Sequence, residues 1–126
     1  VPLNSLQDLS AHRLLHVDWG SLTNQSPDWG MWAQAAGLEG VPVNKGPRFT
    51  VENMAIEAAI NADGVALVCH SAVVEDLRAG RLVRPFDLTV QSDIAYWLVC
   101  PEAHLQRAKV KAFCDWLSLE VSQKSA

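Results

Sequence analysis

Cys69, His70 and Ser71 stand side by side and carry the groups that hydrolases use as nucleophile and base. A thiolate beside an imidazole is the arrangement of cysteine hydrolases. Cys69 is the last residue of an unbroken apolar run, 65–69, which is typical of a buried strand. Neighbouring residues of a strand point to opposite faces of a sheet. We therefore favour a buried strand cysteine followed by a histidine at a cleft or surface. We identify no convergent acid, base and nucleophile, so we expect no enzyme.

The chain also contains residue types that bind metals, including four histidines. His12 and His16 lie on either side of an expected change from helix to strand, so they share no helical face. No pair of cysteines has the close spacing typical of structural zinc sites. We therefore expect no metal site and no cofactor among the candidates, which are His12, His16, Asp18, His70 and His104.

Thr50, Glu52 and Asn53 form a further polar group, where an extended segment, 48–51, leads into a helix. The first backbone N–H groups of a helix are free and its dipole favours an anion, so this helix start could hydrogen-bond a small ligand. The simpler alternative is that Thr50 only caps the helix. Glu52 opposes a carboxylate ligand, which leaves the charge of the ligand open.

The composition indicates a globular protein without a nucleic-acid-binding surface of its own. The chain has 126 residues, which fits one domain of about 100 to 200 residues. Apolar residues make up 49% of it and charged residues 19%, so it can form a packed core. A net charge of -4 argues against a broad phosphate-binding surface. Three widely spaced cysteines, and the lack of a signal peptide or of an apolar run near the roughly 20 residues of a membrane helix, predict a cytoplasmic chain.

Around these residues the sequence pattern alternates strands and helices. We expect, in order, a helix at 5–12, a strand at 14–17, a helix after Ser26, an extended segment at 48–51, a helix ending near 63–64, a strand at 65–69, a helix at 72–79, two strand-like runs within 80–102 and a long final helix. The expected N-caps are Ser26, Thr50 and Ser71, and the glycines expected just past helix ends are Gly37 and Gly80. This alternation favours an α/β domain with a largely parallel sheet.

Ligands of such sheets bind at the carboxyl ends of the strands, beside helix N-termini. That edge is expected to carry Asp18, Trp19, Thr50, Glu52, Asn53 and His70. The tryptophans Trp29 and Trp32 lie three residues apart on one helical face, without neighbouring cations, so we expect them to pack in the core and not to stack on bases.

Six motifs occur in an order that matches a known family: "DLSAHRLLHVDW", "WGMWAQAAGL", "GPRFTVENMAIEAAINADGVAL", "VVEDLRAGRLVRPFD", "YWLVCPE" and "KVKAFCDWLSLE". The chain resembles the C-terminal half of LysR-type transcriptional regulators, and within them the branch of the glycine-cleavage-system activator. The resemblance covers nearly the whole chain, although each motif is weak alone. One departure is Ala62-Asp63-Gly64, where relatives usually have Gly-x-Gly.

The resemblance implies an effector-binding domain similar to type II periplasmic binding proteins, with two lobes that close on a small metabolite. Residues 1–87 would be the second lobe, 88–102 a hinge connector and returning strand, and 103–126 a helix of the first lobe, so that the chain is a fragment. The six edge residues named above would contact the effector. DNA would be bound only by a helix-turn-helix domain that this chain lacks. The alternative is a solute-binding protein of the same architecture.

The final helix has an apolar face that needs a partner. The face consists of Val110, Phe113, Cys114, Leu117 and Val121. Exposing large apolar side chains costs about 1.5–3 kcal/mol each, so we expect self-association, as a homodimer or tetramer in the regulator.

Overall fold

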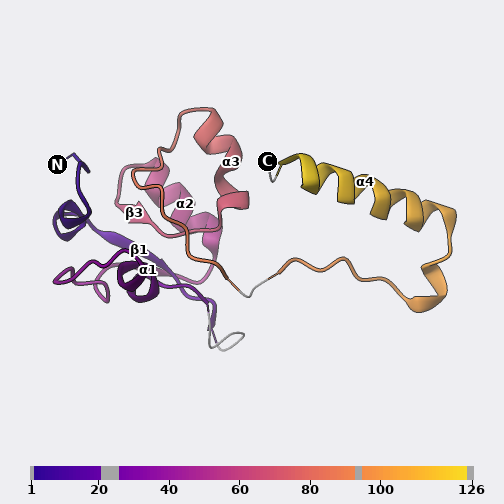
Figure 1. Ribbon diagram of the computed structural model, residues 1–126, viewed down its shortest axis with the longest axis horizontal. Helices are drawn as coiled ribbons and strands as arrows, with labels where there is room; N and C mark the ends of the chain where they lie inside the picture. The colour runs from indigo at the N-terminus through magenta and orange to yellow at the C-terminus, as the bar shows by residue number, and fades with distance from the viewer. Residues whose placement is uncertain (1, 21–25, 93–94, 125–126) are drawn as a thin grey trace. The chain divides into compact units, whose positions relative to one another are not determined.

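The computed structural model describes residues 2–20, 26–92 and 95–124. They fall into two compact units, Val1–Ile94 and Ala95–Ala126, which we describe separately (Figure 1). The divisions expected after residues 87 and 102 stay predictions. Residues 93–94 of the expected connector and 125–126 of the expected terminal helix lie outside the described residues.

A small parallel sheet forms the centre of the first unit. Its strands are β1 (Leu14–Val17), β2 (Arg48–Phe49) and β3 (Val65–Ala66), in the order β2-β1-β3. β1 pairs with both neighbours in parallel, with His16 opposite Arg48 and Leu14 opposite Val65. The strand expected at 14–17 is therefore confirmed, and so is the α/β class with a parallel sheet. His16 can be buried in the middle strand because its Nε2 lies 3.0 Å from the carbonyl oxygen of Lys45.

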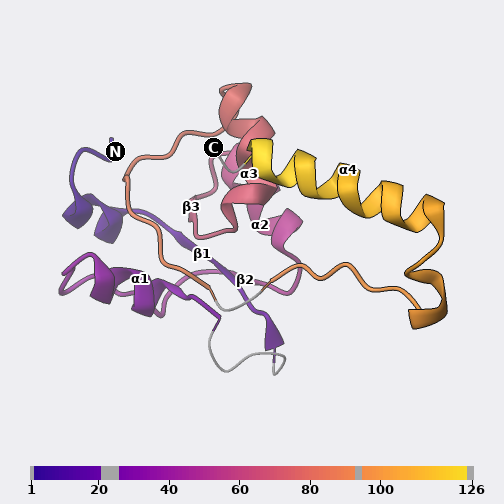
Figure 2. The same cartoon turned by 45° about the vertical axis from the view of Figure 1, so that its right-hand side comes forward.

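Helices cover both faces of the sheet. The first unit contains a 3-10 helix η1 (Leu6–Ala11) and the helices α1 (Trp29–Ala35), α2 (Glu52–Ile60) and α3 (His70–Arg78). Figures 1 and 2 show α1 on one face of the sheet and α2 on the other. Leu14 and Leu15 are both almost fully buried, since successive side chains of the central strand enter opposite halves of the core.

The two tryptophans of α1 lie in the core, as their spacing predicts. Trp29 and Trp32 pack edge to face, with ring centroids 5.5 Å apart. The indole N–H of Trp29 donates to the carbonyl oxygen of Leu15 at 3.0 Å, and that of Trp32 donates to Leu88 at 3.3 Å. Phe86 lies against Trp32, with centroids 6.0 Å apart. These contacts hold the segment after α3 against α1.

All three expected helix N-caps are wrong by one or two residues. The N-cap of α1 is Asp28 and not Ser26, because the Asp28 carboxylate accepts the N–H of Met31 at 2.8 Å. Val51 and not Thr50 is the N-cap of α2, since the chain is still turning away from β2 at Thr50 and the helix begins at Glu52.

The N-cap of α3 is Cys69 and not Ser71, so that Ser71 lies in the first turn of the helix. The physical reason is a contact with another helix, because the Glu52 carboxylate accepts the N–H of Cys69 at 2.6 Å and fixes the point where α3 begins. The glycine stops are confirmed: Gly37 and Gly80 follow the C-caps with φ of 63° and 70°.

Several expected strands and one helix are shorter than their apolar runs. Only the first two residues of 48–51 and of 65–69 pair in the sheet, and α2 ends at Ile60, before the expected 63–64. Residues 81–92 and 95–101 belong to no strand of the described chain. The returning strand expected within 88–102 stays a prediction.

The second unit contains a short 3-10 helix η3 (Glu102–His104) and the helix α4 (Ala108–Lys124). The expected terminal helix is thus confirmed. Two large apolar side chains that were not part of the predicted face are also exposed, Trp116 by 53% and Leu119 by 62%. Phe113 and Trp116 contact each other, with ring centroids 5.7 Å apart.

Candidate functional site

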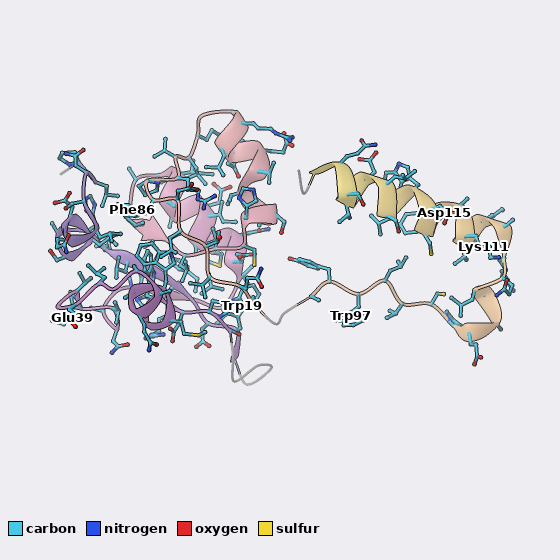
Figure 3. The ribbon with its side chains drawn as sticks, in the orientation of Figure 1. Trp19, Glu39, Phe86, Trp97, Lys111 and Asp115 are labelled. Carbon is cyan, nitrogen blue, oxygen red and sulfur yellow. The ribbon has the colours of Figure 1, made fainter. Side chains whose placement is uncertain are left out.

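The carboxyl ends of the three strands meet at one edge of the sheet, because all three run in the same direction. Asp18 follows β1 there and its N–H donates to the carbonyl oxygen of Phe49, at the end of β2, at 2.7 Å. α2 begins shortly after β2, and α3 begins shortly after β3. In Figure 3 Trp19 lies at this end of the first unit and Glu39 at the opposite end.

A cavity of about 540 Å³ reaches this edge within the first unit. Its volume lies in the range of about 300–1,000 Å³ that small-molecule sites occupy. The polar residues Trp19, Glu52 and His70 come from three different strand-to-helix junctions and line the same cavity. Most of the remaining wall is apolar, including Ile56 of α2 and Val73 of α3. The cavity therefore combines an apolar wall with a few polar groups at one end.

Glu52 joins the starts of two helices. It is the first residue of α2, and its carboxylate accepts the backbone N–H of Cys69 in front of α3. Burial, a hydrogen bond from the Cys69 thiol to Glu52 and the charge of Glu52 raise the pKa of the thiol to about 11. An activated nucleophile needs a lowered pKa, so this environment opposes thiolate chemistry. Cys69 is a half-buried helix cap and not the strand residue we expected.

The structure brings together only part of the predicted site. Trp19, Glu52 and His70 line the large cavity, while Asp18 lies with Trp19 in a second one of about 170 Å³. Asp18 accepts the N–H of Gly20 at 2.9 Å and so stabilises its own turn. Thr50 and Asn53 are exposed and line neither of these two cavities.

Residues 82–90 form a wall of the cavity that the sequence prediction missed. Phe86, Leu88 and Val90 line it from this segment. The signal was present, because apolar residues alternate with exposed ones here, as on a half-buried extended chain. Arg81 and Arg84, which are both exposed, also line the cavity.

In the described part of the chain, no group of three histidine, cysteine or acidic residues could hold a metal ion. Over the same residues, every helix is too short or too polar to cross a membrane.

The family model for the LysR substrate binding domain matches residues 1–121 of the sequence. The chain belongs to this family. Its fold is accordingly that of the type II periplasmic-binding-protein class, which confirms the fold and family expected from the motifs.

The relatives of this LysR substrate-binding domain are transcriptional regulators. The glycine cleavage system transcriptional activator of Escherichia coli strain K12 is 34% identical over 116 residues, which are 92% of this chain and 36% of that protein. The HTH-type transcriptional activator AmpR of Providencia stuartii is also 34% identical over 116 residues, covering 92% of this chain and 37% of that protein. The chain thus spans about a third of the length of these curated relatives.

One solved structure is also similar to this LysR substrate-binding domain. It is the effector domain of the transcriptional regulator AmpR of Pseudomonas aeruginosa, with a TM-score of 0.69 and 28% identity. The match covers 97% of this chain and 58% of that one. The three proteins named here are thus transcriptional regulators, in agreement with the expectation that the chain is not an enzyme.

Proposed function

We propose that this domain senses a small metabolite at the carboxyl edge of its sheet, as part of a LysR-type transcriptional regulator. The observation that carries the proposal is the cavity of about 540 Å³, lined at one end by Trp19, Glu52 and His70. Each of these residues comes from a different strand-to-helix junction, which is the arrangement of ligand sites in open α/β sheets. Asp18, Thr50 and Asn53 complete the proposed site from the same edge.

The effector would act by shifting a conformational equilibrium and not by chemistry. Residues 1–87 would form the second lobe, and 88–102 would lead back to the first lobe, which includes the helix within 103–126. A ligand that binds both lobes has a higher affinity for the closed state, so it increases the population of that state. This change would alter how the subunits of the regulator are arranged on DNA.

The second unit supports a role in assembly. Tyr96 is 86% and Trp97 82% exposed, and α4 adds exposed Phe113 and Trp116. Such a density of exposed aromatic residues marks a surface that contacts protein. We propose that these residues pack against the rest of the first lobe, and that the regulator is a homodimer or tetramer in the cytoplasm. DNA contact would belong to a helix-turn-helix domain elsewhere in the protein.

The solute-binding alternative has the same architecture, but the relatives found by sequence are transcriptional regulators, which favours the sensor. The test uses the product of the complete gene. It should contain a helix-turn-helix domain, bind DNA upstream of its own or neighbouring genes, and change its footprint with one metabolite from a screened panel. A product that contains no such domain and binds no DNA would contradict the proposal.

A matched pair of variants tests whether the effector binds in the cavity. Trp19→Ala should abolish the response of the footprint to the metabolite and preserve DNA binding, because Trp19 lines the cavity. Met31→Ala also removes a large side chain, from the exposed side of α1, and should leave the response intact.

A further inference from the structure

The charged side chains that line the cavity are not equally free to bind a ligand. The carboxylate and guanidinium side chains in its lining are those of Glu52, Arg81 and Arg84. The Arg81 guanidinium pairs with Asp76, which is mostly buried, through both its Nε and a terminal nitrogen. Arg84 pairs with Asp87 at 3.0 Å. The charge of Arg81 is therefore balanced by a mostly buried carboxylate, whereas Arg84 pairs with an exposed one.

Glu52 has no such counter-charge in the described part of the chain. The salt bridges found there join Arg78, Arg81 and Arg84 to other acids. The contacts of Glu52 are the N–H and thiol of Cys69, which are neutral donors. A half-buried carboxylate with neutral partners places a negative charge at the end of the cavity that also contains Trp19.

The same contact closes the place where an anion would bind. A helix N-terminus attracts negative ligands, but the carboxylate of Glu52 already lies in front of α3 and accepts the N–H of Cys69. A ligand carboxylate here would be repelled by Glu52, whereas an ammonium group would be attracted to Glu52 and to the face of an indole ring.

We infer that the effector of this domain is a small organic cation, such as an amine or guanidine with an apolar body, and that Glu52 selects its charge. The apolar wall takes the body of the ligand, and Glu52 with Trp19 takes the cationic group. This inference rests on the proposed sensor function and specifies its ligand class.

The test compares three probes that have one apolar body and different charges. They are 2-phenylethylamine, 2-phenylethanol and phenylacetate, titrated into the complete regulator with this domain 15N-labelled, while the amide signal of Cys69 is followed by NMR. Because the amide of Cys69 donates to Glu52, it reports contact at that carboxylate. The amine should bind about tenfold more tightly than the alcohol or the acid, as one partly desolvated charge pair contributes roughly this factor.

Two glutamine variants on α2 separate the cavity from general charge effects. Glu52→Gln retains an acceptor for the N–H of Cys69 and should remove the tenfold preference for the amine. Glu57→Gln removes the same charge from an exposed position of the same helix and should preserve the preference. If Glu52→Gln does not fold, the comparison of the three probes on the parent chain decides by itself.

Tighter binding of phenylacetate than of the amine, or no binding of the amine, would overturn the inference and leave the sensor proposal in place. Equal affinity of the amine for the Glu52→Gln and Glu57→Gln variants would assign Glu52 a capping role only and would also overturn it. Failure of the complete protein to bind DNA would instead contradict the sensor proposal, and the charge preference would stand.

Discussion

Replacing Ala62 by glycine should stabilise the first unit, because Ala62 lies just past the C-cap of α2 in a backbone conformation that favours glycine. Its φ is +62°, and it donates to the carbonyl oxygen of Ala59 at 3.0 Å. The next residue, Asp63, donates to Ala58 at 2.9 Å, which completes a Schellman motif. α1 and α3 end in the same pattern, but with Gly37 and Gly80 at the corresponding position.

The expected gain follows from two opposing costs. A non-glycine residue in the left-handed region costs about 1–2 kcal/mol, and glycine loses about 0.5–1 kcal/mol of unfolded-chain entropy on folding. Ala62→Gly should therefore raise the free energy of unfolding by about 0.5–1 kcal/mol. Gly80→Ala should lower it by a similar amount, since a Cβ on Gly80 would meet no atom within 4 Å and the backbone conformation is the only cost.

Urea denaturation followed by tryptophan fluorescence measures both changes in one series, with the parent chain as reference. The reasoning predicts opposite shifts of the midpoint at constant slope for the two variants. A midpoint for Ala62→Gly at or below that of the parent chain, together with an unchanged Gly80→Ala, would refute it.

Four further outcomes are expected from individual side chains. Asp28→Ala should cost about 1 kcal/mol in a denaturation experiment, because it removes the cap of α1, and an unchanged stability would contradict that role. Trp29→Phe should cost about 1–3 kcal/mol, since the carbonyl oxygen of Leu15 loses its indole donor; a cost near zero would show that this bond does not stabilise the fold. Because the pKa of Cys69 is raised to about 11 from 9.0, its thiol should react slowly with iodoacetamide at pH 8. Glu52→Gln should accelerate labelling by up to about tenfold, as mass spectrometry would show, and an unchanged rate would contradict the coupling. Because the pKa of the thiol is higher in the folded chain, its contribution to the free energy of unfolding is complete below pH 9 and decreases as the pH rises toward 11. Cys69→Ser should remove this decrease, as denaturation at several pH values would show.

Local signals predicted the parts of the fold that local physics determines. The apolar run 14–17 forms the central strand because both faces of that strand are covered. Trp29 and Trp32 reach the core because their spacing places them on one face of α1. Gly37 and Gly80 mark helix ends because the left-handed conformation there favours glycine.

Contacts between distant segments determine the parts that the sequence pattern did not predict. α3 begins at His70 because the carboxylate of Glu52 accepts the backbone N–H of Cys69, which lies 17 residues further along the chain. The wall formed by 82–90 is fixed by a hydrogen bond from Trp32 to Leu88, which are 56 residues apart. A short stretch of sequence does not contain both partners of either contact. The alternation within 82–90 indicates a half-buried extended chain, but the surface that it packs against is known only from the structure.

The same limit applies to the candidate site. The strand order predicts that Asp18, Trp19, Thr50, Glu52, Asn53 and His70 gather at one edge, and the structure places all six there. The strand order does not determine which of them face the cavity, and Thr50 and Asn53 are exposed and lie outside its lining.

The most direct test of the account is NMR mapping of the effector on the complete regulator, in which this domain is 15N-labelled. The account predicts that the largest shifts occur at Trp19, Glu52 and Cys69, where the carboxyl ends of the strands meet. Shifts centred on Glu39 at the opposite end of the unit, with unchanged signals at these three residues, would contradict it.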